Sequence, residues 1–79
     1  MQITIYTKEG CQPCKASKRL MTKEGLSFQE ELITEANSGY LKAMGYMSAP
    51  VTVLSDKEGN QVVKWAGFQP DLIKAIKSQ

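Results

Sequence analysis

The amino-acid sequence predicts an α/β fold in which a four-stranded mixed sheet is flanked by three helices, in the order β-α-β-α-β-β-α. Polar and apolar side chains alternate over residues 2–7, as they do in a strand. Apolar side chains recur at helical spacing over residues 13–25, and two β-branched runs flank a turn at residues 56–60. A right-handed βαβ unit would make the first two strands parallel, and the hairpin would extend the same sheet.

The first strand and the first helix are joined by a turn at residues 8–10. Pro13 suits the first turn of the helix, because its missing N–H needs no partner there, and Gly25 supplies a left-handed stop. The side chains that share one face of the strand are Ile3, Ile5 and Thr7, and the expected inward stripe of the helix is Ala16, Leu20 and Met21.

The middle of the chain gives a weaker pattern. Residues 26–33 predict a second strand with an acidic outer face. Either Asn37 or Ser38 can cap a short helix that ends at Gly45. The apolar side chains of this helix are Tyr40, Leu41 and Met44.

The last third of the chain predicts a hairpin followed by a helix. The β-branched runs are residues 51–55 and 61–65, and the polar turn between them favours an antiparallel pair. Pro70 and Asp71 open the closing helix. Its expected apolar stripe is Leu72, Ile73 and Ile76.

Length and composition limit the class of protein. The 79 residues suffice for one hydrophobic core, so we expect a single domain over residues 1–79. Hydrophobic residues make up 42% and charged residues 23%, which excludes a disordered or fibrous chain. The longest apolar run, residues 49–54, is far shorter than the roughly 20 residues of a membrane span, and residues 1–6 do not resemble a secretory signal. We therefore expect a cytoplasmic protein without membrane association.

Charge and residue usage exclude several kinds of chemistry. The net charge of +2 is too small to indicate nucleic-acid binding, and the basic stripe on the first helix is short and lacks interleaved aromatic residues. Charge is unevenly distributed, with +4 over residues 1–23 and −4 over residues 24–35. The absence of histidine excludes Ser-His and Cys-His hydrolases, and two cysteines cannot complete a four-ligand zinc site, so we expect no metal.

The Cys11-Gln12-Pro13-Cys14 segment carries the main functional prediction. Two residues between cysteines at the start of a helix bring both sulfurs within disulfide range. The partial positive charge of a helix N-terminus lowers the pKa of an exposed thiol, so Cys11 is the expected nucleophile. Cys14, one turn further on, is expected to be more buried and to resolve the mixed disulfide. A static disulfide and half of an intermolecular zinc site are the alternatives, but redox exchange is favoured because cytosolic chains rarely keep structural disulfides.

Other residues near the cysteines have both a functional and a purely structural interpretation. Lys8 and Lys15 could favour the thiolate while Glu9 opposes it, or the two lysines could be ordinary surface charges. A cis bond between Ala49 and Pro50 would turn the Ala49 backbone toward Cys11, where a substrate chain could pair as an added strand. A trans Pro50 that merely begins the strand is the alternative.

Several motifs of this chain, in the same order along the sequence, resemble those of the NrdH-redoxins, which are small glutaredoxin-like proteins of the thioredoxin fold. The resemblance spans nearly the whole chain and is therefore more specific than the cysteine pair alone. The matching segments are Ile3-Thr4-Ile5-Tyr6-Thr7, Cys11-x-x-Cys14-Lys15-Ala16, the Gly45-Tyr46 pair, Ala49-Pro50-Val51, and Trp65-Ala66-Gly67-Phe68-Gln69-Pro70-Asp71.

This resemblance implies a dithiol-disulfide oxidoreductase that donates electrons to a class Ib ribonucleotide reductase. It also implies that thioredoxin reductase recharges the protein with NADPH, with no bound cofactor other than the redox-active Cys11–Cys14 disulfide. By residue correspondence, Cys11 is the attacking thiol, Cys14 the resolving thiol and Pro50 a cis-proline beside them. The expected partner-binding residues are Lys8, Gln12, Pro13, Ala49, Pro50, Trp65, Gly67, Phe68 and Asp71. We expect a monomer.

The chain departs from the family pattern at a few positions. Gln12-Pro13 stands where the family commonly has Val-Gln, and Ala66 and Gln69 replace a serine and an arginine. The intervening dipeptide affects thiolate stability and partner choice. Trp65 has an alternative interpretation as a packing residue, as large aromatics near a strand end usually are.

Two other functions remain open at this level. A glutathione-dependent glutaredoxin usually offers a second glycine before its last helix, and here Phe68 and the Pro70 ring should hinder a carboxylate that seeks backbone donors, so we expect weak glutathione binding. A non-catalytic thioredoxin-fold adaptor would dock through Ala49-Pro50 and Phe68 without using its cysteines.

Overall fold

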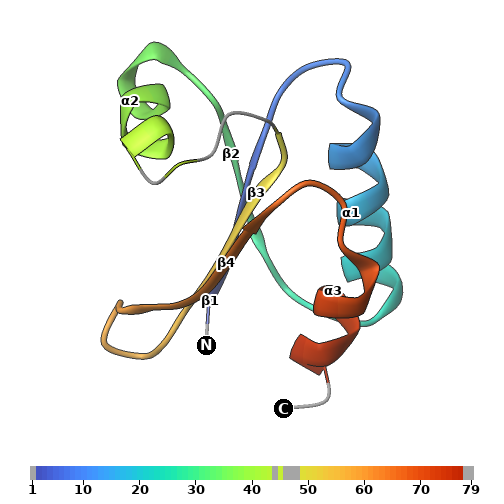
Figure 1. Ribbon diagram of the computed structural model, residues 1–79. Helices are drawn as coiled ribbons and strands as arrows, with labels where there is room; N and C mark the ends of the chain where they lie inside the picture. Colours follow the sequence, from blue (N-terminus) through green and yellow to red (C-terminus); the bar gives the residue numbers. More distant parts are fainter. Residues whose placement is uncertain (1, 44, 46–48, 78–79) are drawn as a thin grey trace.

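The predicted alternation of strands and helices is present in the structure of the protein, a computed structural model that describes residues 2–43, 45 and 49–77 (Figure 1). Its elements are β1 (Gln2–Thr7), α1 (Gln12–Lys23), β2 (Gln29–Leu32), α2 (Glu35–Ala43), β3 (Val51–Ser55), β4 (Gln61–Ala66) and α3 (Pro70–Lys77).

The strands form the predicted four-stranded mixed sheet, in the order β2-β1-β3-β4. β1 pairs in parallel with β2 and antiparallel with β3, and β3 pairs antiparallel with β4. Ile5 lies opposite Glu30 on one side and Thr52 on the other. The carboxyl end of β1, which leads to the cysteines, is therefore held on both sides by neighbouring strands.

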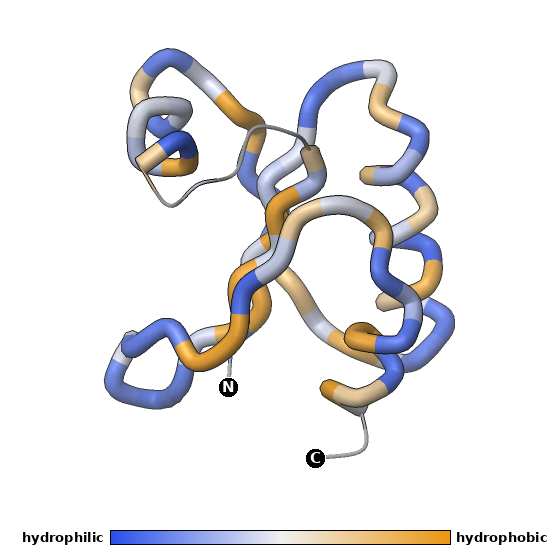
Figure 2. The backbone as a smooth tube through the Cα atoms, in the orientation of Figure 1, coloured by the Kyte–Doolittle hydropathy of each residue, from blue (hydrophilic) through white to orange (hydrophobic). Residues whose placement is uncertain are grey.

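The period-2 alternation of β1 divides the core between the two faces of the sheet. α1 and α3 cover one face, and α2 covers the other (Figure 1). The buried cluster under α1 and α3 is Ile3, Ile5, Met21, Leu54, Trp65 and Ile73, and the cluster facing α2 is Leu41, Val51 and Val53. Figure 2 shows hydrophobic residues along the central strands and a hydrophilic turn between β3 and β4.

The second strand is shorter than predicted. Only residues 29–32 pair with β1, and all four are exposed. Leu26 and Phe28 precede the strand and pack, partly buried, against the core under α1. Leu26 and Phe28 are apolar because they contact the core, and they do not pair with β1. The apolar pattern over residues 26–33 therefore overestimated the length of the strand.

The second helix begins earlier than predicted, so the proposed caps are wrong. The carbonyl of Thr34 accepts hydrogen bonds from the N–H groups of Asn37 and Ser38, at 3.2 and 2.8 Å. Asn37 lies inside the first turn, and its Oδ1 accepts a hydrogen bond from the Thr34 N–H at 2.8 Å. The side chain that was expected to cap the helix thus reaches back to Thr34, the residue just before the helix, as in a capping box. Met44 lies outside the described residues.

Two inward-facing stripes also differ from prediction. On α1 the buried residues are Cys14, Ser17 and Met21, so the inward stripe includes a serine, which an apolar pattern does not reveal. On α3, Ile73 is fully buried, but Leu72 is 36% exposed. The predictions for Met21 and Ile73 are confirmed, and Leu20 and Ile76 pack, partly buried, against the same core. Ala16 is half-buried, and the prediction for Leu72 is wrong.

Candidate active site

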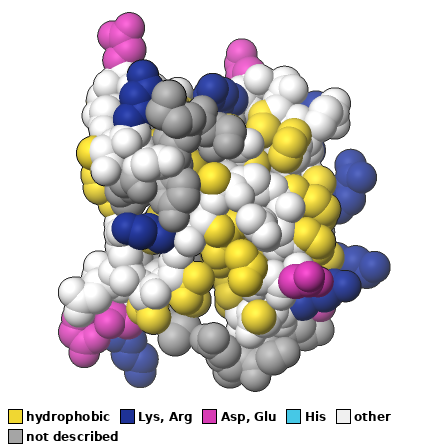
Figure 3. Space-filling view, viewed as in Figure 1, with side chains coloured by type: hydrophobic (Ala, Val, Ile, Leu, Met, Phe, Trp, Pro, Cys, Tyr) yellow, Lys and Arg dark blue, Asp and Glu magenta, His cyan; other side chains and the backbone are white. Residues whose placement is uncertain are grey.

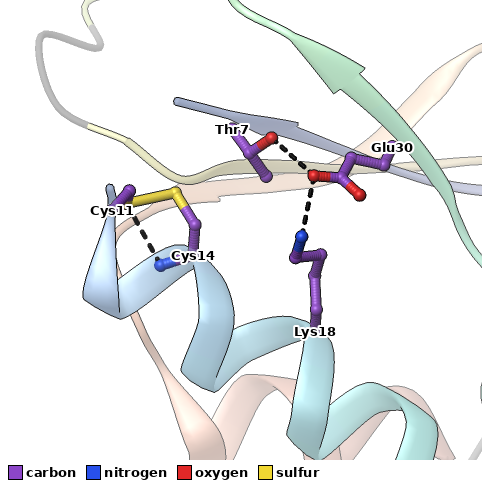
Figure 4. A network of polar contacts seen from close by, with 5 residues as sticks. All are labelled: Thr7, Cys11, Cys14, Lys18 and Glu30. Carbon is purple, nitrogen blue, oxygen red and sulfur yellow. Dashed lines mark hydrogen bonds and ion pairs between the residues drawn. A yellow bond between two sulfur atoms is a disulfide. The ribbon is translucent and has the colours of Figure 1, made fainter. Parts of the chain in front are cut away.

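The two cysteines lie at the N-terminus of α1 and are joined in a disulfide, with their Cα atoms 5.2 Å apart (Figure 4). Cys11 is the N-cap of the helix, and a proline stands in the first turn, as the sequence predicted. The Cys14 N–H donates a hydrogen bond to Cys11 Sγ over 3.2 Å. The helix therefore directs an otherwise unpaired backbone donor at the sulfur that was predicted to attack.

The two sulfurs have different surroundings. Cys14 is buried, with 1% of its surface exposed, whereas Cys11 is only half-buried. An incoming partner disulfide can thus approach Cys11 more easily than Cys14. A thiolate on Cys11 would be stabilised by the helix N-terminus, which supplies N–H donors and partial positive charge. This difference in burial is the one expected of an attacking and a resolving thiol.

The segment before β3 contains Ala49 and Pro50, two of the predicted site residues. Pro50 is buried, and its peptide bond with Ala49 is cis. The Pro50 carbonyl accepts a hydrogen bond from the Gly67 N–H at 2.8 Å, which continues the β3–β4 ladder by one pair. Gly67 has φ of +83°, in the left-handed region that favours glycine. This bond ties the segment before α3 to the residue that precedes β3.

The aromatic residues of the predicted partner surface separate into a buried and an exposed one. Trp65 is 5% exposed and belongs to the core cluster with Ile5 and Ile73, which favours the packing interpretation. Phe68 is 41% exposed in the segment that leads into α3. Figure 3 shows that hydrophobic side chains gather over α3 and this segment.

The remaining predicted partner residues have accessible side chains. Lys8 lies in the loop after β1, Gln12 and Pro13 lie in the first turn of α1, and all three are exposed. Asp71 is exposed in the first turn of α3. The Gln69 side chain, which replaces the family's arginine, donates a 3.4 Å hydrogen bond to the Ala66 carbonyl. It therefore bonds within its own segment.

A polar network near the disulfide was missed in the sequence. The Oε2 atom of Glu30 accepts hydrogen bonds from Thr7 Oγ1 and from Lys18 Nζ, each at 2.8 Å (Figure 4). Lys18 and Glu30 also form an ion pair. The sequence placed Thr7 beside Ile5 on one face of the strand, and Glu30 in an acidic stretch, but only the pairing register of β1 and β2 brings them together.

Both hydrogen bonds act on the ionisation of Glu30. The hydrogen bond from Lys18 is the main cause that lowers the pKa of the Glu30 carboxyl below 4.5, and the Thr7 hydroxyl adds to it. Burial acts in the opposite direction and is outweighed. Glu30 is therefore negatively charged at neutral pH.

We expect Glu30→Gln to lower the free energy of unfolding at pH 7 by about 0.2–1 kcal/mol, the range of ion pairs that solvent screens. A carboxyl whose pKa is lowered in the folded state contributes stability above its unfolded pKa, near 4.5, and loses it as pH falls through the folded pKa. The difference between wild type and variant should therefore shrink below pH 4.5. Urea denaturation at pH 7 and at pH 2.5 measures it, with Glu31→Gln as the matched control. A difference that persists unchanged at the lower pH would contradict the assignment to charge.

Two further observations apply to residues 2–43, 45 and 49–77. Over these ranges, no group of three or more cysteine or carboxylate side chains is arranged to hold a metal ion. No helix formed by these residues has both the length and the apolar character needed to cross a membrane.

Comparisons with known proteins agree with this geometry. The family model described as Glutaredoxin matches residues 3–58. The glutaredoxin-like protein NrdH of Salmonella typhimurium is 35% identical over an alignment 79 positions long, which covers 96% of this chain and 89% of that protein. The Gene 56 protein of Mycobacterium phage L5 is 32% identical, over 94% of this chain and 70% of the relative.

A solved structure extends the likeness to three dimensions. The NrdH-redoxin of Escherichia coli superimposes with a TM-score of 0.85 at 33% identity, over 96% of this chain and 95% of that one. That protein is described as glutaredoxin-like with a thioredoxin-like activity profile. The fold, the helix-capping cysteine pair and these relatives together show that the chain belongs to the glutaredoxin family, as an NrdH-like thiol-disulfide oxidoreductase of the thioredoxin-like fold.

Proposed function

We propose that this protein is the dithiol electron donor of a class Ib ribonucleotide reductase, and that thioredoxin reductase recharges it with electrons from NADPH. The observation that carries the proposal is the Cys11–Cys14 disulfide at the mouth of α1, on a fold that matches the E. coli NrdH-redoxin over nearly its whole length. The thioredoxin-like activity profile ascribed to that relative supports a thioredoxin-type reductant.

The proposed cycle moves two electrons and balances at each step. The Cys11 thiolate attacks one sulfur of the target disulfide, a mixed disulfide forms, and the other target sulfur leaves as a thiolate that takes up a proton. Cys14 then loses its proton and attacks Cys11 Sγ, which releases the target dithiol and closes the Cys11–Cys14 disulfide. In recharging, the reductase returns two electrons from NADPH, and the disulfide opens to two thiols. The reaction belongs in the cytosol, where thiols are kept reduced.

The residues around Cys11 are proposed to bind the partner chain. Lys8, Gln12 and Pro13 lie next to it in sequence and are exposed. Ala49 is proposed to pair with an extended segment of the partner, with the buried Pro50 beneath it. Gly67, which donates a hydrogen bond to the Pro50 carbonyl, is proposed to form one edge of the partner-binding surface. Phe68 and Asp71 are proposed to contact the partner, and Trp65 to support them from the core.

Several features support thioredoxin reductase over glutathione as the reductant. The start of α3 offers a proline, which has no N–H, where a glutathione carboxylate would seek backbone donors. Asp71 adds a negative side chain in the same turn, which repels a carboxylate. The exposed Phe68 side chain further hinders glutathione from reaching the start of α3.

A side-by-side assay tests this proposal. We expect NADPH and thioredoxin reductase to reduce the Cys11–Cys14 disulfide in repeated turnovers, and glutathione with its own reductase to do so at least about tenfold more slowly, a difference of about 1.4 kcal/mol in barrier. NADPH oxidation at 340 nm is followed with insulin as the final disulfide, and then with a class Ib ribonucleotide reductase. Faster turnover with glutathione would establish a glutathione-dependent glutaredoxin in its place.

A further inference from the structure

The network of Thr7, Lys18 and Glu30 joins three elements at one carboxylate oxygen. Thr7 ends β1, Lys18 lies in α1, and Glu30 lies in β2. Both hydrogen bonds end on Oε2, at 2.8 Å. Thr7 is buried, whereas the Lys18 and Glu30 side chains are 32% and 38% exposed. The shared oxygen is therefore bonded to a buried hydroxyl on one side and to a partly exposed ammonium group on the other.

The path of α1 brings this network to the disulfide. The helix runs back over the face of β1, because Met21 near its end packs in one cluster with Ile3 and Ile5. Lys18, nearly one turn before Met21, reaches Glu30, which lies opposite Ile5 in the sheet. Cys14 is one turn before Lys18 and therefore on the same side of the helix. Figure 4 shows Thr7, Lys18 and Glu30 on the Cys14 side of the disulfide.

The remaining charges on the elements around Cys14 are exposed to solvent. Among the described side chains they are Lys8 and Glu9 in the loop before α1, Lys15, Arg19 and Lys23 on α1, Glu31 on β2, and Asp71 and Lys74 on α3. Solvent screens exposed charges most strongly, so their influence on a buried thiol is small. Lys18 is half-buried, and Glu30, although exposed, is held in place by the buried Thr7 hydroxyl.

We propose that Glu30 and Lys18 act in opposition on the Cys14 thiolate and thereby set the thiol–disulfide equilibrium of the pair, with Thr7 holding Glu30 in place. All three are positioning residues, since none touches the sulfur–sulfur bond of a substrate. The proposal concerns the chemistry of the cysteine pair itself and is independent of which partners it serves.

The direction in which each variant shifts the thiol–disulfide equilibrium follows from the charge that it removes. Reduction by a reference dithiol breaks the Cys11–Cys14 bond, forms two thiols that are partly ionised, and oxidises the reference to its disulfide. A negative charge near the pair disfavours the thiolate and thus the reduced protein, and a positive charge favours both. The carboxylate of Glu30 offsets the ammonium of Lys18 in the wild type. Removing one of the two leaves the other uncompensated.

The test measures the equilibrium of each variant with a dithiothreitol redox buffer at pH 7. We expect Glu30→Gln to shift the equilibrium toward the reduced protein and Lys18→Gln toward the oxidised protein, each on the order of two- to tenfold. A tenfold shift corresponds to about 30 mV. The double variant should return to within about twofold of wild type, since it removes both charges. The ¹³C NMR titration of Cys14 Cβ should show a lower thiol pKa in Glu30→Gln and a higher one in Lys18→Gln.

Matched controls remove the same charges nearby. Glu31→Gln lies on the same strand as Glu30, and Arg19→Gln follows Lys18 on the same helix. Both controls should shift the equilibrium less than the corresponding test variants do. Single variants that shift in the same direction, or no further than their controls, overturn the proposal.

Two further measurements separate charge from packing. In 1 M salt, where screening acts over about 3 Å, the opposite shifts of the two single variants should shrink. Shifts that are unchanged in salt would overturn the proposal.

Thr7→Val keeps both charges and the side-chain shape but frees Glu30, so its shift in the equilibrium should have the same sign as that of Glu30→Gln and be smaller. The opposite sign would contradict the positioning role of Thr7. Fluorescence of Trp65, which lies in the core, reports whether each variant is folded.

Discussion

Replacing Cys11 by serine is expected to reduce disulfide reduction to the background rate, whereas replacing Cys14 by serine should leave a nucleophile that attacks once and then stops. The reason is the difference between the two positions. Cys11 caps α1, is half-buried and accepts a hydrogen bond from the Cys14 N–H, whereas Cys14 is 1% exposed. A serine hydroxyl at position 11 does not ionise near neutral pH and cannot replace the thiolate.

Mass spectrometry and the insulin assay distinguish the two variants. Cys14→Ser should accumulate as a mixed disulfide with a target protein, because no second thiol is present to resolve it. Cys11→Ser should form none. If instead Cys11→Ser retained both turnover and the mixed disulfide, Cys14 would be the nucleophile. A partner whose affinity and effect survive in both variants would indicate an adaptor that does not use its cysteines.

The largest expected effect on stability is that of Ile73→Ala, at about 2–5 kcal/mol. Ile73 is fully buried in the cluster that joins α3 to the sheet, so truncation removes apolar contacts and leaves a cavity. Because a domain of this length has a net stability of roughly 4–12 kcal/mol, the loss is a large fraction of the total. Urea denaturation followed by the fluorescence of Trp65 measures it, since Trp65 belongs to the same cluster.

The neighbouring residue provides the control. Leu72→Ala removes the same number of carbon atoms from the same helix at a side chain that is 36% exposed. We expect a cost below about 1 kcal/mol, because much less apolar surface leaves the interior. Equal costs for the two variants would mean that α3 does not dock through Ile73.

The sequence predicted the elements whose signals are local. The alternation in β1, the proline after Cys11, and the polar turn of the β3–β4 hairpin each depend on residues close together in the chain, and the structure confirms all three elements. Burial of Cys14 was predictable in the same way, because it lies one turn inside a helix that packs on a sheet.

Features that depend on long-range packing were predicted less well. Ser17 is completely buried although it is polar, since its place on α1 faces the sheet. Leu72 and Ile73 are adjacent and both apolar, so only the docking angle of α3 decides which one is buried. The contact of Glu30 with Thr7 depends on the parallel register of β1 and β2, which no local pattern specifies.

The short β2 strand, whose four residues are all exposed, has a consequence for behaviour at high concentration. It forms one outer border of the sheet, and Glu30 and Glu31 stand there side by side. Its outer edge pairs with no other strand among the described residues, and such an edge is a template onto which a second molecule can add. Two copies meeting along this border would bring carboxylates against carboxylates, and the repulsion opposes the first step of aggregation through the sheet.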